Sequence, residues 1–105
     1  MTERAIQREI RGFLRQLGFA VYETSQGYRR EPGGTRTTAG LADLYVMGHG
    51  IALWVEVKAP KGKLRPSQEA FRTECEANGI AWYLWRDVMD AWAWCVAQDY
   101  IQEAA

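Results

Sequence analysis

A short turn between two β-rich runs constrains the fold of this chain more than any other feature. Residues 41–47 and 51–58 are rich in Leu, Val, Ile and Trp, and the sequence Gly48-His49-Gly50 joins them. Apolar runs separated by so short a Gly-containing segment are typical of a β-hairpin. The sequence therefore predicts two neighbouring antiparallel strands, around which the other elements are arranged.

The turn also predicts the register of the hairpin. If His49 and Gly50 are its two central residues, Gly48 pairs with Ile51, and continuing the pairing places Asp43 opposite Glu56. A three-residue turn would shift the pairing by one residue. Directly opposed side chains lie about 5 Å apart at Cβ, so two carboxylates there repel each other unless a cation lies between them.

Lys58 joins this acid pair, because side chains two residues apart share one face of a strand. Paired carboxylates suit a hard cation such as Mg²⁺ or Mn²⁺, and a lysine beside them could orient or deprotonate water or stabilise charge on a phosphate. The alternative for Glu56-x-Lys58 is an ordinary ion pair on a solvent-exposed sheet face. The opposite face is apolar and predicts a core surface of Ala42, Leu44, Val46, Leu53, Val55 and Val57.

The remaining elements follow from hydrophobic periodicity and capping residues. The patterns predict a helix from Thr2 to Gly18, a strand over 19–24, a helix from Pro66 to Asn78–Gly79, a strand over 80–85 and a final helix capped by Asp87. The order α-β-β-β-α-β-α predicts an α/β fold with a central mixed β-sheet flanked by helices. A length of 105 residues is that of a single domain, residues 1–105.

Charge is unevenly distributed although 13 basic and 13 acidic side chains give a formal net charge of zero. Residues 1–38 sum to +3, residues 58–72 to +4 and residues 73–105 to −5. Between the two basic segments stand only two charged side chains, Asp43 and Glu56. Basic segments on both sides of an acid pair indicate a surface that could bind a polyanion.

Composition excludes several other classes of protein. The 48% hydrophobic and 25% charged residues are ordinary for a soluble globular domain, and no apolar run is long enough to cross a bilayer. The N-terminus lacks the pattern of a signal peptide, so we expect a cytoplasmic protein without a membrane partner. Cys75 and Cys95 have no metal-binding spacing and are expected to be small buried apolar side chains.

Three motifs resemble those of a known nuclease superfamily. Gly40-Leu41-Ala42-Asp43, then Glu56-Val57-Lys58, then Gln68 resemble the PD-(D/E)XK nucleases. Glu3-x-x-Ile6-Gln7, the Gly-x-x-Asp form of the first motif and the stretch from Glu56 through Leu64 to Pro66-Ser67-Gln68 resemble the VRR-NUC (virus-type replication-repair nuclease) branch, in its stand-alone phage or bacterial type. The resemblance spans residues 3 to about 85. Ala42 replaces the superfamily's proline, and Arg65 stands where a Ser or Asp helix cap is expected.

This resemblance implies a role for each matching residue. Asp43 and Glu56 would bind Mg²⁺ or Mn²⁺ with the Val57 carbonyl, and Lys58 would be the catalytic lysine. Gln68 would support the site from the second helix. Glu3 would be the first-helix acid that approaches the metal, with Glu9 as the alternative if the alignment is shifted. The implied activity is metal-dependent hydrolysis of DNA phosphodiester bonds, selective for branched DNA such as Holliday junctions and carried out by a homodimer.

Further residues are candidates for contact with DNA and with a second subunit. Basic side chains in flexible or turn sequences can follow a phosphate backbone, which predicts phosphate contacts by Arg29, Arg30, Arg36, Lys61 and Lys63. The last quarter of the chain holds more aromatic residues than one strand and one helix are expected to bury. An exposed aromatic surplus predicts a homodimer interface in this Trp-rich region; its members are Trp82, Tyr83, Trp85, Trp92, Trp94 and Tyr100.

Two interpretations compete with a nuclease. One is a non-catalytic DNA-binding or dimerisation module that retains the nuclease fold; such a copy is expected to lose an acid or the lysine, whereas Asp43, Glu56 and Lys58 are all present. The other is a structural α/β interaction protein that uses its Trp-rich end. It predicts neither DNA cleavage nor a change in melting temperature with metal.

Overall fold

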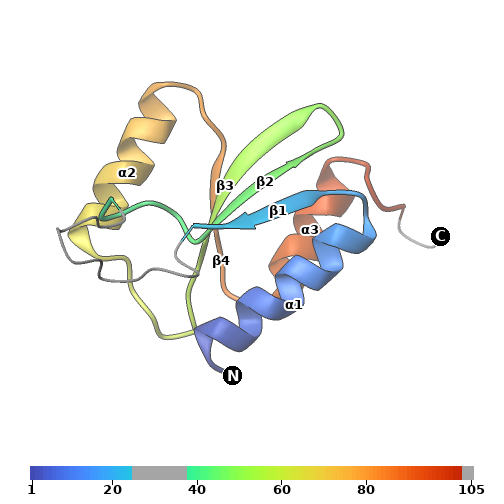
Figure 1. Cartoon of the computed structure of the whole chain (residues 1–105), viewed down its shortest axis with the longest axis horizontal. Coiled ribbons are helices and arrows are strands. Elements are labelled where there is room, and N and C mark those ends of the chain that lie inside the picture. Colours follow the sequence, from blue (N-terminus) through green and yellow to red (C-terminus); the bar gives the residue numbers. More distant parts are fainter. Residues whose placement is uncertain (25–37, 103–105) are drawn as a thin grey trace, which may run out of the picture.

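The computed structural model describes residues 1–24 and 38–102, and in these its elements follow the predicted order (Figure 1). The four strands form one sheet in the order β1-β2-β3-β4. β1–β2 and β2–β3 are antiparallel and β3–β4 is parallel, which confirms the predicted mixed α/β sheet. The elements are α1 (Glu3–Gln16), β1 (Ala20–Glu23), β2 (Leu44–Gly48), β3 (Ile51–Val57), α2 (Pro66–Ala77), β4 (Trp82–Trp85) and α3 (Val88–Ala97).

The hairpin between β2 and β3 has the predicted register. His49 and Gly50 both have positive φ, 54° and 80°, as the two central residues of a type I′ turn require. Gly48 pairs with Ile51 and the ladder continues to Leu44 opposite Val55. A two-residue turn therefore fixes the pairing, and the shifted register of a three-residue turn does not occur.

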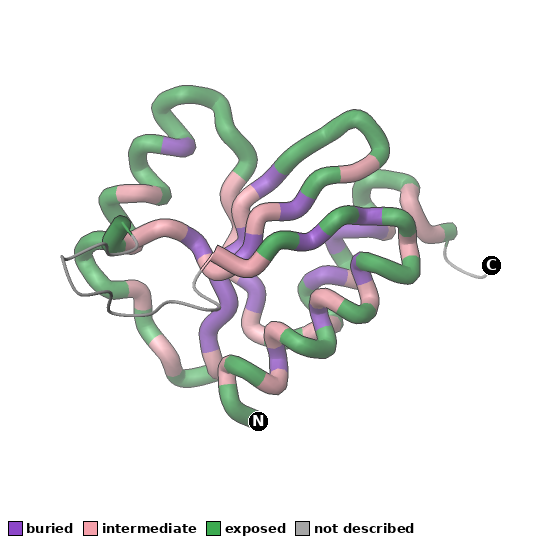
Figure 2. The backbone as a smooth tube through the Cα atoms, viewed as in Figure 1, coloured by how far each residue is buried: buried purple, intermediate pink, exposed green. Residues whose placement is uncertain are grey.

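Helices α1 and α3 lie side by side on one face of the sheet, and α2 lies on the other (Figure 1). The predicted apolar face is completely buried under α1 and α3. Figure 2 shows this burial where the strands meet the two helices, whereas α2 is exposed along most of its length. The sheet side chains of this core are Val21, Leu44, Val46, Leu53, Val55, Val57 and Trp85.

The predicted helix ends are confirmed by their capping bonds. The Thr2 Oγ1 hydroxyl accepts a hydrogen bond from the Ala5 N–H at 3.1 Å, and Gly18 follows α1 with a φ of 90°. The Asp87 carboxylate accepts from the Asp90 N–H at 3.1 Å at the start of α3. These caps satisfy backbone groups that the ends of helices would otherwise leave unpaired.

The expected exposed aromatic surplus of the C-terminal quarter is not present. Trp85 and Trp94 are buried, and the other four aromatic residues of that group are half-buried. Trp94 has ring-centroid distances of 5.8 Å to Phe19 and 5.6 Å to Tyr100, so side chains from outside the strand and helix complete its packing. The argument for a dimer through exposed aromatic side chains in this region was therefore wrong.

The prediction for the two cysteines is confirmed. Cys75 and Cys95 are free and buried, as predicted for small apolar side chains. No helix in residues 1–24 or 38–102 is long and apolar enough to cross a bilayer.

Candidate active site

Asp43 lies directly before β2 and is held from both neighbouring strands. Its backbone carbonyl accepts a hydrogen bond from the Thr24 N–H at 3.0 Å, and its Oδ2 accepts one from the Val57 N–H at 2.9 Å. The β2–β3 ladder ends at the Leu44–Val55 pair, so this carboxylate binds the β3 backbone just beyond the last pair. The side chain of Asp43 is thereby fixed beside Glu56.

The structure explains why position 40, three residues before Asp43, is a glycine. Its φ is 91°, and a Cβ at this position would collide with the backbone carbonyl of Ser67 in the first turn of α2. Only a residue without a side chain allows this close approach at positive φ. Gly40 thus lets the segment before Asp43 pack directly against α2.

Glu56 and Lys58 are buried charged residues, with exposed fractions of 1% and 7%. The alternative of an ordinary ion pair on a solvent-exposed sheet face is therefore wrong. Neither carboxylate oxygen of Glu56 has a hydrogen-bond partner among the described residues. Buried polar atoms without a partner are costly and rare in native proteins, so these oxygens need a proton or an added ligand.

The electrostatics of the site act most strongly on Glu56. Burial first, and then the adjacent Asp43 carboxylate, raise the pKa of Glu56 from 4.5 to about 9. The charge of Glu3 acts in the same direction, and the ammonium of Lys58 opposes it. The metal-free site therefore holds Glu56 in its protonated form near neutral pH.

Of the two candidate acids in α1, only Glu3 acts electrostatically on Glu56. Glu3 is half-buried at the start of α1 and raises the pKa of Glu56, whereas Glu9 is exposed and has no such effect. Within the described residues, however, no group of three or more acidic, His or Cys side chains is close enough together to hold a metal ion. Two carboxylates meet in the site, and ligation by Glu3 remains a prediction.

Gln68 has a structural role that the sequence motif does not reveal. Its Oε1 accepts a hydrogen bond from the Arg65 N–H at 2.8 Å at the start of α2. The side chain of Arg65 forms no capping hydrogen bond of its own. Gln68 thus supplies the capping interaction where the sequence lacks a Ser or Asp, and its support of the acid pair stays a prediction.

The acid pair fits a divalent cation by the chemistry of its donors. Mg²⁺ and Mn²⁺ prefer carboxylate and carbonyl oxygens, and Glu56 presents two buried oxygens that nothing in the described chain satisfies. Asp43 Oδ2 is already oriented by the Val57 N–H. The residues that would hold the cation are Asp43, Glu56 and the Val57 carbonyl.

No protein-family model matches the sequence, and no curated protein matches it significantly. A solved structure described as "VRR_NUC domain" superposes with a TM-score of 0.68 at 20% sequence identity, over 96% of this chain and 100% of that chain. The chain has the fold of a VRR_NUC domain. The resemblance predicted from the motifs is thus confirmed at the level of the fold.

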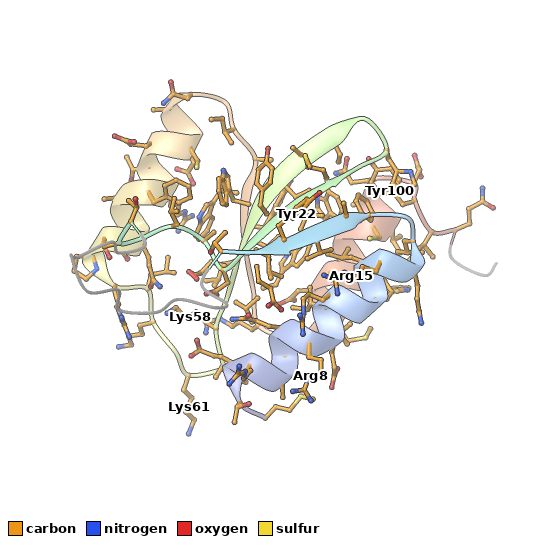
Figure 3. All side chains as sticks on the ribbon, viewed as in Figure 1. Arg8, Arg15, Tyr22, Lys58, Lys61 and Tyr100 are labelled. Carbon is orange, nitrogen blue, oxygen red and sulfur yellow. The ribbon has the colours of Figure 1, made fainter. Side chains whose placement is uncertain are left out.

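Within this VRR_NUC fold, the predicted DNA-binding residues fall into two groups. Lys61 and Lys63 are exposed in the turn that follows β3. Figure 3 shows Lys58 and Lys61 near the N-terminal end of α1, at the same end of the sheet. The three arginines predicted to contact phosphate lie outside the described residues, so their role remains a prediction: Arg29, Arg30 and Arg36.

Arg86 is a residue of this region that the sequence interpretation missed. It directly follows β4, and its Nη1 donates hydrogen bonds to the carbonyls of Ala59, Pro60 and Gly62 at 2.8, 3.2 and 2.8 Å. The available signal was weak: Arg86 is the lone basic residue in the acidic segment 73–105. Its partners are 24 to 27 positions away, beyond any local pattern.

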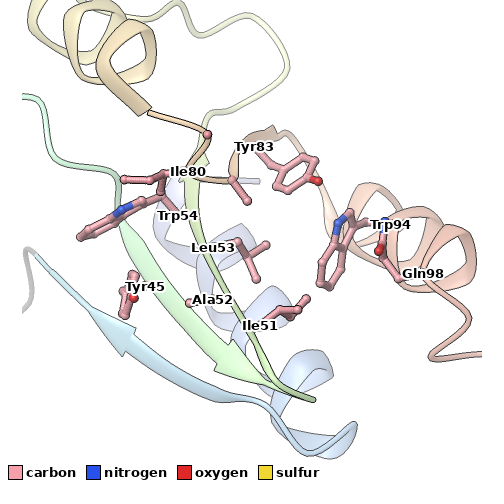
Figure 4. A pocket seen from close by; sticks show the side chains of 11 residues that line it. Tyr45, Ile51, Ala52, Leu53, Trp54, Ile80, Tyr83, Trp94 and Gln98 are labelled. Carbon is pink, nitrogen blue, oxygen red and sulfur yellow. The ribbon is translucent and has the colours of Figure 1, made fainter. Parts of the chain in front are cut away.

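A pocket of about 640 Å³ opens at the other end of β3 and is distinct from the acid pair (Figure 4). No carboxylate, histidine or cationic side chain lines it, and it includes none of the predicted site residues. The acid pair of Asp43 and Glu56 therefore lies outside this apolar pocket. The lining residues are Tyr45, Ile51, Ala52, Leu53, Trp54, Gly79, Ile80, Ala81, Tyr83, Trp94 and Gln98.

Proposed function

We propose that this protein is a Mg²⁺- or Mn²⁺-dependent endonuclease that hydrolyses phosphodiester bonds in DNA. The observation that supports it best is Glu56, buried with two unsatisfied oxygens beside Asp43. A site that only stabilised the fold would satisfy such a carboxylate with donors. The VRR_NUC fold and the motifs that resemble the nuclease family support the same proposal.

Each residue of the site has a distinct task in this reaction. Asp43 and Glu56 hold the cation, which when bound supplies Lewis acidity and lowers the pKa of coordinated water. Burial of Lys58 strengthens the electrostatic effect of its ammonium group on a phosphate that gains charge in the transition state. Lys61 and Lys63 bind the backbone of the strand that is cut.

Cleavage of labelled DNA tests the proposal. A four-way junction, a splayed arm and a linear duplex are incubated with Mg²⁺, Mn²⁺ or EDTA, and we expect cutting only with metal. Lys58→Met keeps the apolar stem of the side chain and should lower the rate about 100-fold or more. Glu69→Gln removes an exposed charge on α2 and serves as the matched control. Cutting by Lys58→Met at the wild-type rate would overturn the assignment.

The preference for branched DNA and the homodimer belong to the same proposal. Two paired cuts in a junction need two sites, which a twofold dimer supplies. A neutral chain with two basic segments is suited to modest, salt-sensitive DNA affinity in which substrate shape contributes to selectivity. Mass measurement in solution tests the dimer; a monomer that resolves junctions with paired cuts would contradict it.

A further inference from the structure

One side chain, that of Arg86, holds residues 59–62 of the segment between β3 and α2. A single nitrogen of Arg86, Nη1, contacts three carbonyl oxygens of residues 59–62. This nitrogen carries two hydrogens, so one of them is shared between two acceptors. Hydrogen bonds from a charged donor are stronger than neutral ones, and Arg86 forms no ion pair with any described residue that would compete for it.

The Arg86 clamp, defined by these three bonds, is rigidly connected to the site. Arg86 follows Trp85, whose carbonyl accepts a hydrogen bond from the Lys58 N–H at 3.2 Å. The Arg86 N–H itself donates to Asp90 Oδ2 at 2.7 Å, which fixes its backbone to α3. The clamp therefore ties the turn to the end of β4 and to the core helix behind it.

The turn held by this clamp carries the two exposed lysines. Lys61 lies between the clamped carbonyls of Pro60 and Gly62, and Lys63 follows directly. On its other side the turn approaches Glu3, because a Cβ built on Gly62 would lie 3.5 Å from Glu3 Oε2. The conformation of the turn thus determines where two basic side chains stand relative to the N-terminus of α1 and the acid pair.

We infer that Arg86 is a positioning residue for DNA binding: it holds the 59–62 turn so that Lys61 and Lys63 meet the phosphate backbone beside the acid pair. This inference rests on the proposed nuclease function. Lys58 keeps its own ladder bond to Trp85, so loss of the clamp affects the binding of DNA more than the chemical step. The effect belongs to KM and to the dissociation constant of DNA, with kcat largely preserved.

The test compares Arg86→Ala, Arg86→Lys and Arg15→Ala. Arg15 is the matched control, because its Nη2 also donates to a carbonyl, that of Val21 at 2.8 Å, and it lies at the far end of α1 from Lys61 (Figure 3). KM and kcat are measured on a labelled four-way junction with Mg²⁺, and the dissociation constant with Ca²⁺ in its place. Hydrogen exchange of the Gly62 amide, which bonds to the Ala59 carbonyl at 2.8 Å, reports the turn itself.

We expect Arg86→Ala to raise KM and the dissociation constant about tenfold, with kcat within about threefold of wild type, because loss of positioning acts on contacts rather than on chemistry. Arg86→Lys should recover part of this loss, because an ammonium lacks the planar fork of a guanidinium. Exchange of the Gly62 amide should be faster in Arg86→Ala and unchanged in Arg15→Ala.

Three results would overturn the inference. The first is an unchanged KM in Arg86→Ala, and the second is a kcat that falls by a larger factor than KM rises. The third is weaker DNA binding with unchanged exchange at Gly62, which would make Arg86 a direct DNA contact. If the wild-type protein binds junctions but cuts none, the nuclease proposal fails, whereas the dissociation constant and the exchange rate still decide the role of Arg86.

Discussion

The stability of the metal-free protein should fall as the pH rises, because Glu56 is protonated only in the folded state. Its pKa is raised to about 9 from 4.5 by burial and by Asp43. Between these two values the folded chain binds one proton more than the unfolded chain does. A group of this kind contributes its full stability below its unfolded pKa and loses it as the pH approaches the folded pKa.

The size of this pH effect follows from the one extra proton that the folded chain binds. The free energy of unfolding changes by about 1.4 kcal/mol per pH unit for each proton of difference. From pH 6 to pH 8 the loss is about 3 kcal/mol, a large part of the roughly 5–15 kcal/mol of a typical domain. At about 4–8 °C per kcal/mol for a domain of this size, the melting temperature in EDTA should fall by at least about 10 °C.

The assay is thermal and urea unfolding in EDTA at pH 6, 7 and 8, with Glu56→Gln beside the wild type. The variant keeps the size of the side chain and cannot ionise. As the pH rises, its free energy of unfolding should therefore increase relative to that of the wild type by about 1.4 kcal/mol per pH unit. Titrating groups that do not interact with Glu56 are common to both proteins and cancel in the difference. If the free energy of unfolding of the wild type changed with pH in parallel with that of Glu56→Gln, the claim that Glu56 is buried in its protonated form would be refuted.

Three further predictions test the site. Gly40→Ala should cost at least about 2 kcal/mol in urea unfolding, because its Cβ meets the backbone of α2 at positive φ. Asp43→Asn should fold, since its amide oxygen can still accept from the β3 backbone, but should lose metal-dependent cleavage by about 100-fold or more. Glu3→Gln should weaken metal-dependent cleavage and the exposed Glu9→Gln should not; the reverse ranking, measured as the Mg²⁺ concentration for half-maximal rate, would exclude Glu3.

Much of the fold could be predicted because its signals are local. The turn at His49 and Gly50 fixes a two-residue hairpin, and from it the pairing of β2 with β3 follows one residue at a time. Capping at Thr2 and Asp87 fixes two helix starts in the same way. In these cases the residues that determine the structure lie within a few positions of one another.

Features that depend on distant contacts could not be predicted. Alternation along a strand places Glu56 and Lys58 on one face, but their depth of burial depends on what covers that face. Trp94 packs against Phe19, which precedes β1, as well as against the nearby Tyr100, so a count of aromatic residues in the C-terminal segment alone overestimated their exposure. The Arg86 clamp likewise joins β4 to a turn more than 20 residues earlier.

The two acids of the site differ in a way that their spacing alone does not show. Asp43 lies just outside β2 and accepts a backbone hydrogen bond, whereas Glu56 lies inside β3 and accepts none. A donor stabilises the ionised form of a carboxylate, and burial without a donor favours the protonated form. In the metal-free state Glu56 is therefore the protonated carboxyl near neutral pH. Asp43 and Glu56 would hold a divalent cation in their ionised forms, so metal binding near pH 7 should release about one proton and should tighten as the pH rises.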